Sequence, residues 1–372
     1  MATINGTAGN NVLNGTQQND VLNANWSGGN DKMYGKNGND SYFVNSLGDQ
    51  VIEVGTGIDT VVSRLAFYDL PNNVENLVLD IGGANGIGNG LDNSLQGNDS
   101  NNSLWGNEGN DELWGYKGVD KLYGGAGSDT LHGGQGNDIL DGGSDGDVMQ
   151  GFSGNDTYYV DSFSDVIDGE APTQFFPNMG IDTVYSSVSR GLEVNIENLI
   201  LTEAASGFSW AGGNELNNQL TGNSFDNGLY GFAGNDTLKG LGGNDSLGGY
   251  EGNDNLNGGD GSDLLSGDEG TDALTGGVGS DRFYFWAENN SPNSSLRDSI
   301  KDFKSSEGDE IDISAIDADA STPFSNEAFT NFQINYDPIS HILSADVIGS
   351  STDFSVDLTG VGPGFSLANV IL

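Results

Sequence analysis

Aspartate recurs at every ninth position over long stretches of this chain of 372 residues. Two stretches, residues 88–159 and 213–284, each divide into eight consecutive nine-residue units without an insertion. A shorter series over residues 6–43 has Asp20, Asp31 and Asp40 at the sixth position of its units. In the two long stretches the sixth-position aspartates are Asp111, Asp120, Asp129, Asp138, Asp147, Asp156, Asp236, Asp245, Asp254, Asp263, Asp272 and Asp281. Carboxylates in so regular a series are candidate ligands for a hard metal cation.

Calcium is the cation that suits these carboxylates. It takes oxygen ligands at ~2.3–2.6 Å in flexible geometry, whereas magnesium demands a strict octahedron and keeps its water. We expect carboxylates and turn carbonyls to bridge at least four ions, and roughly eight to fourteen in all. The alternative, that these residues only form Asp-Gly turns in a β-rich chain, explains neither the spacing of nine nor its length.

Glycine at the first and fourth positions predicts a tight turn, because glycine adopts positive φ angles without steric cost. We assign the fourth-position glycines to the metal sites together with the aspartates, since their turns carry the carbonyls. These glycines are Gly109, Gly118, Gly127, Gly136, Gly154, Gly234, Gly243, Gly252, Gly261, Gly270 and Gly279.

The elements that must position the turns are short strands. The eighth position is apolar in all twenty units, from Leu13 through Leu131 to Phe283, including a unit that starts at Trp26. A three-residue strand around this position points one side chain inward. Two units then make a coil of eighteen residues, and coils stacked ~4.8 Å apart place the aspartates in two ladders, one on each side.

The units Gly124–His132 and Gly133–Asp141 follow the pattern G-G-x-G-x-D-x-U-x. The chain therefore resembles the RTX (repeats-in-toxin) family of calcium-binding proteins. The resemblance implies an all-β fold, a parallel β-roll or calcium-binding nonapeptide solenoid, with multiple Ca²⁺ ions as its cofactor.

Four units depart from the pattern and are expected to bind no metal. Each has Asn at the sixth position and no glycine at the fourth: Asn93, Asn102, Asn218 and Asn227. They form the first coil of each long array, which we interpret as a metal-free starter coil. Gln18 and Asp145 replace the turn glycine before Asp20 and Asp147, so these two units are expected to bind weakly.

The arrays divide the chain into six parts. A short roll (1–43), a β-rich spacer (44–87) and a roll (88–159) are followed by a second spacer (160–212), a roll (213–284) and a C-terminal β cap (285–372). The spacers resemble each other, as in Gly57-Ile58-Asp59-Thr60-Val61 and Gly180-Ile181-Asp182-Thr183-Val184. They also resemble the spacers of secreted RTX proteins and of alginate C5-epimerase R-modules. We expect antiparallel or irregular coils there.

The cap resembles the C-terminal domain of serralysin-type secreted proteases, in runs such as Asp298–Phe303 and Gly308–Ser314. A solenoid needs a cap over its last coil. In that family the C-terminus also carries a type I secretion signal, which the apolar tail Ala368–Leu372 resembles. The start of the chain has no basic stretch or apolar run of a cleavable leader. The resemblance implies the type I secretion machinery as a partner and an extracellular location, either free or associated with the cell surface.

Composition excludes several classes of partner. The chain has 55 acidic and 11 basic residues, a formal net charge of −44, 60 glycines and no cysteine. Nucleic acid is excluded as a partner because its phosphates require clustered Lys and Arg. No window approaches the ~20 apolar residues of a membrane span. Because the chain has no cysteine, disulfides and thiolate chemistry are also excluded.

We expect no catalytic activity. His132 and His341 are the only histidines, and the zinc signature H-E-x-x-H is absent. The acids lie in the metal turns, and no separate pocket-forming domain is left over. Stacking by eighteen places Trp105 above Tyr123 and Trp114 above His132, a series that could stack on sugar rings or pack against neighbouring strands.

Three functions remain open. The first is a secreted structural protein of a matrix, surface layer or adhesive contact, with possible self-association. The second is a module that binds a cell-surface or matrix polysaccharide. The third is a non-catalytic C-terminal part of a larger secreted toxin or enzyme. The chain begins directly in repeat register, with Gly6, which argues modestly against this third function.

Overall fold

The computed structural model describes residues 1–24, 28–168, 180–203, 207–286, 297–315, 334–338, 341–345, 354–358 and 365–371. The unit start at Trp26 and the terminal Leu372 therefore lie outside the described residues, as do parts of the second spacer and of the cap. The chain divides into two compact units, Met1–Thr183 and Val184–Leu372, and each is described by itself.

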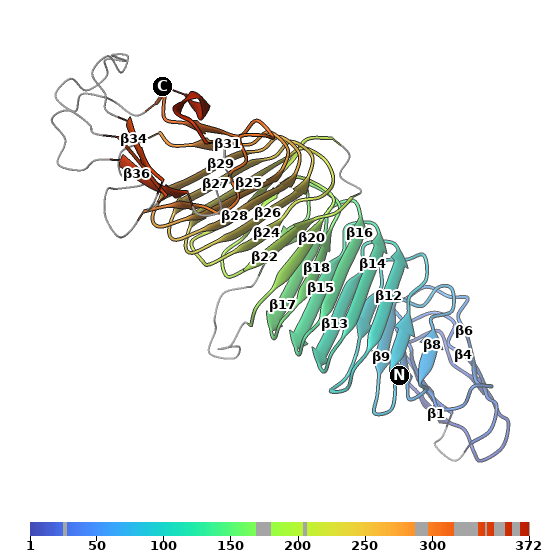
Figure 1. The fold of residues 1–372 in the computed structure, drawn as a ribbon. Coiled ribbons are helices and arrows are strands. Elements are labelled where there is room, and N and C mark those ends of the chain that lie inside the picture. Colours follow the sequence, from blue (N-terminus) through green and yellow to red (C-terminus); the bar gives the residue numbers. More distant parts are fainter. Residues whose placement is uncertain are drawn as a thin grey trace. The chain divides into compact units, whose positions relative to one another are not determined.

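The first unit is built from short strands (Figure 1). Its first ten are β1 (Thr3–Asn5), β2 (Val12–Asn14), β3 (Val21–Asn23), β4 (Lys32–Tyr34), β5 (Ser41–Val44), β6 (Gln50–Ile52), β7 (Thr60–Ser63), β8 (Phe67–Asp69), β9 (Asn76–Leu79) and β10 (Asn85–Ile87). The next nine are β11 (Ser94–Gln96), β12 (Ser103–Glu108), β13 (Glu112–Lys117), β14 (Lys121–Ala126), β15 (Thr130–Gln135), β16 (Ile139–Ser144), β17 (Val148–Ser153), β18 (Thr157–Val160) and β19 (Val166–Ile167).

Alternate strands of this unit pair in parallel, so that the chain winds as a solenoid with two walls. The odd-numbered strands β1 to β19 form one ten-stranded sheet, and β8, β10, β12, β14, β16 and β18 follow one another in the other wall. Leu104 pairs with Leu122 and Leu113 with Leu131, a register of eighteen residues. The expected coil of two nonapeptides, and with it the parallel β-roll, is confirmed.

The second unit repeats this winding. The division between the units falls within β20 (Thr183–Ser186). The following strands are β21 (Arg190–Gly191), β22 (Asn198–Leu201), β23 (Ser209–Gly212), β24 (Gln219–Thr221), β25 (Asn227–Ala233), β26 (Thr237–Gly242), β27 (Ser246–Glu251), β28 (Asn255–Asp260), β29 (Leu264–Glu269), β30 (Ala273–Val278) and β31 (Arg282–Tyr284). Leu238 pairs with Leu256 and Leu247 with Leu265, again eighteen residues apart and in parallel.

The spacers are parallel coils of the solenoid, and the expectation of antiparallel or irregular coils is wrong. β5 pairs with β7 and β7 with β9, both in parallel, and β9 pairs in parallel with β11 of the next array. In the second spacer β17 pairs with β19, and β21 with β23, in parallel. The spacer strands have the same inward-facing apolar residues as the repeats, so the same winding buries them; only their loops are longer.

The C-terminal segment contains β32 (Ser299–Ile300), β33 (Glu310–Asp312), β34 (Ile334–Asp337), β35 (Ile342–Ala345), β36 (Phe354–Leu358), the 3₁₀ helix η2 (Leu367–Asn369) and β37 (Val370–Ile371). β32, β33 and β37 continue the parallel walls. β34, β35 and β36 are antiparallel to one another, and β36 joins β32 in parallel. This change of direction ends the parallel stacking in one wall.

The core is one narrow column of apolar side chains in each unit. All twenty eighth-position residues are buried: Leu13, Leu22, Met33, Tyr42, Leu95, Leu104, Leu113, Leu122, Leu131, Leu140, Met149, Tyr158, Leu220, Leu229, Leu238, Leu247, Leu256, Leu265, Leu274 and Phe283. Within the described ranges, no helix has the length and apolar character that crossing a membrane requires.

Candidate calcium sites in the aspartate ladders

The sixth-position aspartates form two hydrogen-bonded ladders on the two sides of each roll. The backbone N–H of Asn93 donates to Oδ1 of Asp111, that of Asp111 to Asp129, and that of Asp129 to Asp147, at 2.7–2.8 Å. On the opposite side the same bond runs from Asn102 through Asp120 and Asp138 to Asp156. The second unit has the corresponding ladders from Asn218 to Asp272 and from Asn227 to Asp281.

The second oxygen of these carboxylates is the candidate metal ligand. Asp111, Asp129 and Asp245 are 1–3% exposed. Among the described residues, a buried Oδ2 without a hydrogen-bond partner occurs in Asp31, Asp40, Asp111, Asp120, Asp129, Asp138, Asp147, Asp236, Asp245, Asp254, Asp263, Asp272 and Asp281. A buried anionic oxygen is costly unless it is paired or coordinates a metal. The ladders therefore offer a candidate cation site at regular intervals.

The raised pKa values of these carboxyl groups also indicate sites that favour a cation. Burial raises the pKa of Asp111, Asp120 and Asp236 to about 7, although the backbone N–H of the preceding coil opposes the rise. The neighbouring carboxylate on the ladder, Asp138 for Asp120, raises the pKa further. A bound divalent cation would reverse these shifts, because it favours the ionised form.

The fourth-position glycines are placed as the sequence predicts. All eleven assigned glycines have positive φ, for example 128° at Gly127 and 140° at Gly252. A Cβ at Gly127 would also collide with the carbonyl oxygen of Gly109 in the preceding coil. The turn therefore requires glycine for its backbone conformation and for the close stacking of coils.

The first-position glycines serve a different purpose from the predicted one. Their φ angles are not positive; the second position takes that conformation instead, as at Asn107 (82°) and Tyr116 (75°). A Cβ at Gly106 or Gly124 would collide with Oδ2 of the aspartate five residues later, Asp111 or Asp129. The missing side chain leaves a cradle beside each unpartnered carboxylate oxygen, lined by the glycine carbonyl of the next coil.

The four asparagine units use both ends of the sixth-position side chain in hydrogen bonds, and in Asn93, Asn102 and Asn218 the amide bonds to carbonyl oxygens of the preceding coil. The Asn93 side-chain amide donates to the carbonyl oxygens of Val74 and Glu75 in the preceding coil, at 3.4 and 3.2 Å. Its Oδ1 accepts the backbone N–H of Asn89 at 2.7 Å. Asn218 does the same with Ile196, Glu197 and Asn214. An amide N–H₂ thus makes the contact to carbonyls that a carboxylate could make only through a cation, which supports the interpretation as metal-free starter coils.

The imperfect units differ from each other. Asp145 keeps the left-handed turn at φ 84° without being glycine, and Asp147 retains an unpartnered Oδ2. Asp20 is different: Oδ1 accepts the N–H of Ala2 at 2.6 Å, and Oδ2 accepts the N–H and hydroxyl of Thr16. Both oxygens of Asp20 are therefore in use, so it is the weakest of the assigned ligands.

The ladders continue beyond the nonapeptides through residues that the nine-residue period did not reveal. The N–H of Asp40 donates to Asp59, that of Asp156 to Asp182, that of Asp272 to Asp298 and that of Asp281 to Asp309. Each acceptor stands two residues before a buried core residue: Val61, Val184, Ile300 and Ile311. This Asp-x-apolar spacing is the signal in the sequence that could have found them.

Some ladders end on aspartates that need no cation. Asp165 accepts Asp147 N–H through Oδ1, and its Oδ2 accepts the N–H groups of Asp161 and Ser162. Asp309 accepts Asp281 N–H through one oxygen and Lys304 N–H through the other. These turns satisfy with backbone donors the oxygen that the repeat aspartates leave unpartnered.

The buried Oδ2 atoms, the glycine cradles and the adjacent carbonyls together make an all-oxygen set that fits calcium. A family model described as the RTX calcium-binding nonapeptide repeat matches residues 5–42, 87–122, 114–149, 150–171, 212–247 and 248–283. These matches cover slightly more than half of the chain. The chain belongs to the family of proteins with RTX calcium-binding nonapeptide repeats, and it binds calcium at multiple repeats. Which residues ligate each ion stays a prediction.

Three solved structures show local likeness to this chain. The R3 subunit of mannuronan C5-epimerase AlgE6 from Azotobacter vinelandii is 26% identical over 42% of this chain and 78% of its own, with a TM-score of 0.24. The R2 subunit is 25% identical over 46% and 94%, with a TM-score of 0.23. Extracellular lipase LipA from Serratia marcescens is 17% identical over 86% and 45%, with a TM-score of 0.24. None of the curated proteins matches the chain.

Proposed function

We propose that this chain is a secreted, non-catalytic structural protein that folds when it meets calcium outside the cell, with a role in a matrix, surface layer or adhesive contact. The observation that carries the proposal is the row of buried carboxylate oxygens without partners, of which Asp111, Asp129 and Asp245 are examples. Carboxylates at this spacing oppose folding until cations lie between them. A net charge of −44 adds self-repulsion.

The availability of calcium then decides where the chain folds. Extracellular calcium modules have dissociation constants of about 10⁻⁴–10⁻³ M, so the low free calcium of a cytosol leaves the ladders empty. Millimolar calcium is about one- to tenfold these constants, so ions that bind only the folded state stabilise it by about 0.4–1.4 kcal/mol per independent site. A dozen such sites contribute about 5–17 kcal/mol, which is comparable to the stability of an ordinary domain, ~5–15 kcal/mol. Export of an unfolded chain through a type I channel suits this behaviour.

Circular dichroism with a calcium chelator, followed by millimolar calcium, tests the proposal. The β-sheet signal and compaction are expected only after calcium is added. Magnesium at the same concentration is the control for ionic strength and should leave the chain unfolded. A complete β signal in the chelator would refute calcium-dependent folding, whatever ions a crystal contains.

Aromatic side chains at the surface support polysaccharide binding as a second candidate function. In the first unit Trp105 stacks on Tyr123 with ring centroids 5.5 Å apart, and Trp114 on His132 at 3.7 Å, which confirms the expected stacking. Burial lowers the pKa of His132, so this ring is neutral near pH 7. These rings pack on one another along the wall.

A pocket in the second unit supports this candidate further. A pocket of about 270 Å³ is lined by residues that include Tyr230, Tyr250, Tyr284, Trp286 and Asp268. The indole N–H of Trp286 donates to Asp268 at 2.7 Å, which orients a ring that is 51% exposed. A glycan array with calcium present tests this candidate. Trp286→Ala should abolish any signal, whereas Trp210→Ala, a change at another exposed ring, should not.

A further inference from the structure

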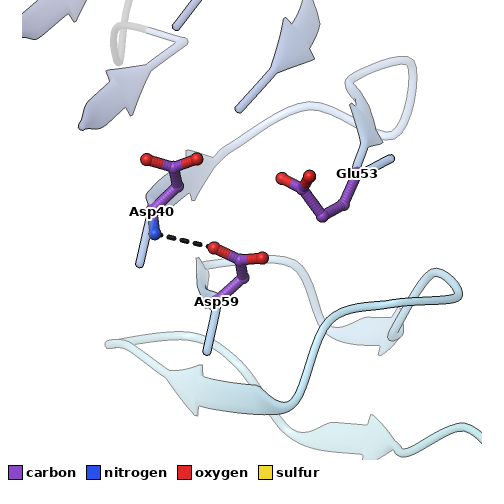
Figure 2. A group of neighbouring side chains, drawn as sticks. All are labelled: Asp40, Glu53 and Asp59. Atoms are coloured by element: carbon purple, nitrogen blue, oxygen red, sulfur yellow. Dashed lines mark hydrogen bonds between the residues drawn. The ribbon is translucent and has the colours of Figure 1, made fainter. Parts of the chain in front are cut away.

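Three buried carboxylates next to the ends of different strands converge where the first array meets its spacer. One oxygen each of Asp40, Glu53 and Asp59 lies within 4.8 Å of the others. Figure 2 shows Glu53 at the end of a strand of its own, opposite the Asp40–Asp59 pair. The three side chains belong to residues that are 1%, 5% and 1% exposed. Asp40 is a repeat aspartate, whereas Glu53 follows β6 and Asp59 precedes β7.

The hydrogen bonds of the cluster leave a negative charge uncompensated. Asp40 Oδ1 accepts the N–H of Asp20 at 2.6 Å, and Asp59 Oδ1 accepts the N–H of Asp40 at 2.7 Å. The buried Asp40 Oδ2 has no hydrogen-bond partner. Among the described residues, no Lys, Arg or His forms a salt bridge with any of the three carboxylates. The three buried acids are therefore offset by neutral donors, which are backbone N–H groups and the Tyr42 hydroxyl.

Glu53 is oriented towards the unpartnered oxygen. Its Oε1 accepts the N–H groups of Val54 and Gly55 at 2.8 and 2.6 Å, and its Oε2 accepts the Tyr42 hydroxyl. A Cβ at Gly35 would collide with Asp40 Oδ2, Glu53 Oε2 and the Tyr42 oxygen together. Gly35 thus leaves a small cradle on which oxygens from two carboxylates and a phenol converge.

We propose that Asp40, Glu53 and Asp59 bind a calcium ion at a site that the nonapeptide does not encode. Oxygens that each lie ~2.3–2.6 Å from one cation can be at most about 4.6–5.2 Å apart, and the three oxygens of the cluster lie within 4.8 Å of one another. The ion joins the last repeat of the first array to the spacer coil through Glu53. This inference rests on the proposed calcium-dependent function but concerns residues beyond the repeat.

Ion counting on the full chain tests the site. Glu53→Gln keeps the size of the side chain and one oxygen for the N–H groups of Val54 and Gly55, and its amide can donate to the Tyr42 oxygen. This variant should bind one calcium ion fewer than the unchanged chain in native mass spectrometry. Asp59→Asn keeps an oxygen for the Asp40 N–H and should lose the same ion. Glu112→Gln removes one exposed charge on β13 and should leave the count unchanged.

A crystal grown with calcium and soaked in terbium gives a readout that needs no variant. An anomalous peak among the three carboxylates supports the site. Unchanged ion counts in both variants, or no peak there while the repeat ladders show theirs, would overturn it. The outcome is separable from the folding test. A chain that is fully folded in chelator refutes the folding switch, yet loss of one ion in Glu53→Gln would still establish this site.

Discussion

The backbone N–H of Asp111 donates to Oδ1 of Asp129, one coil further along the chain, at 2.7 Å. One oxygen of Asp129 thus has a structural task, and the other, buried and without a partner, remains for a metal. The same division holds along the ladders in both units. It separates two effects of mutation, since an asparagine can accept the N–H but cannot supply the charge.

Asp129→Asn should therefore weaken calcium binding more than it weakens the hydrogen-bonded turn. The amide oxygen replaces Oδ1 as acceptor for Asp111, but the anionic ligand is lost, so the sites towards both ladder neighbours, Asp111 and Asp147, should weaken. Calorimetric titration should show at least one ion fewer and a lower midpoint of unfolding in calcium. Asp99→Asn, which removes only an exposed pair with Lys117, is the control. An unchanged ion count would contradict the assignment of Asp129.

Asn93→Ala should have the opposite signature. It removes the amide contacts to Val74 and Glu75 and leaves the N–H of Asn89 without its acceptor. Loss of a partner for a buried polar group costs about 1–3 kcal/mol, so the free energy of unfolding in calcium should fall by that amount. The number of bound ions should stay the same. A loss of calcium would show that the starter coil takes part in a metal site.

In the metal-free chain, protonation of the buried aspartates at acid pH should partly replace calcium in stabilising the fold. Burial raises the folded-state pKa of Asp111 and Asp245 to about 7 and of Asp254 to about 6, against ~3.9 in an unfolded chain. Their protonated forms are thus compatible with folding. This contribution is fully present below about pH 4 and is lost as the pH rises through 6 to 7.

Circular dichroism of the calcium-free chain between pH 4 and 8 should show more β structure at the acid end. With millimolar calcium the trend should reverse, because the ion binds the ionised carboxylates and must displace protons below pH 7. Greater order at pH 8 than at pH 5 without calcium would contradict the burial of these charges.

Gly127→Ala should disrupt the turn that carries the carbonyls. The φ angle of 128° is unfavourable for alanine, and the new Cβ would meet the Gly109 carbonyl. A strained backbone of this kind costs about 1–3 kcal/mol, and calcium affinity should fall with it. Gly9→Ala is a matched control, because its φ is not positive and an added Cβ meets no atom within 4 Å. Equal effects of the two changes, measured by thermal unfolding, would refute this explanation.

The sequence predicts the ladders and the core well because a solenoid turns spacing along the chain into position in space. Leu104 and Leu122 are eighteen residues apart and pair directly. The spacers were harder to predict. Asp59 and Asp182 lie 19 and 26 residues after their donors, so the nine-residue count fails although the chain still winds in parallel.

The purpose of the first-position glycine was also hidden in the sequence. The sequence does not distinguish the purpose of a first-position glycine from that of a fourth-position glycine. In the structure, Gly106 makes room for the Asp111 side chain, whereas Gly109 adopts a positive φ. The cluster of Asp40, Glu53 and Asp59 could not be predicted from the sequence for a related reason. The spacing of these residues does not show that a loop of different length places Glu53 beside the aspartate ladder.

Each strand of an array pairs with the strand two positions later. Whether an array has an even or an odd number of nonapeptide units therefore decides the wall on which the next strand lies. One nonapeptide is half a coil, so an insertion of nine residues would carry every later strand to the opposite wall. An insertion of eighteen would only lengthen the column by one coil, ~4.8 Å. Both long arrays contain eight units, an even number, and the segment after each therefore resumes on the wall where it would have lain without the array. Such proteins can gain or lose whole coils without redirecting the strands beyond them, but not half coils.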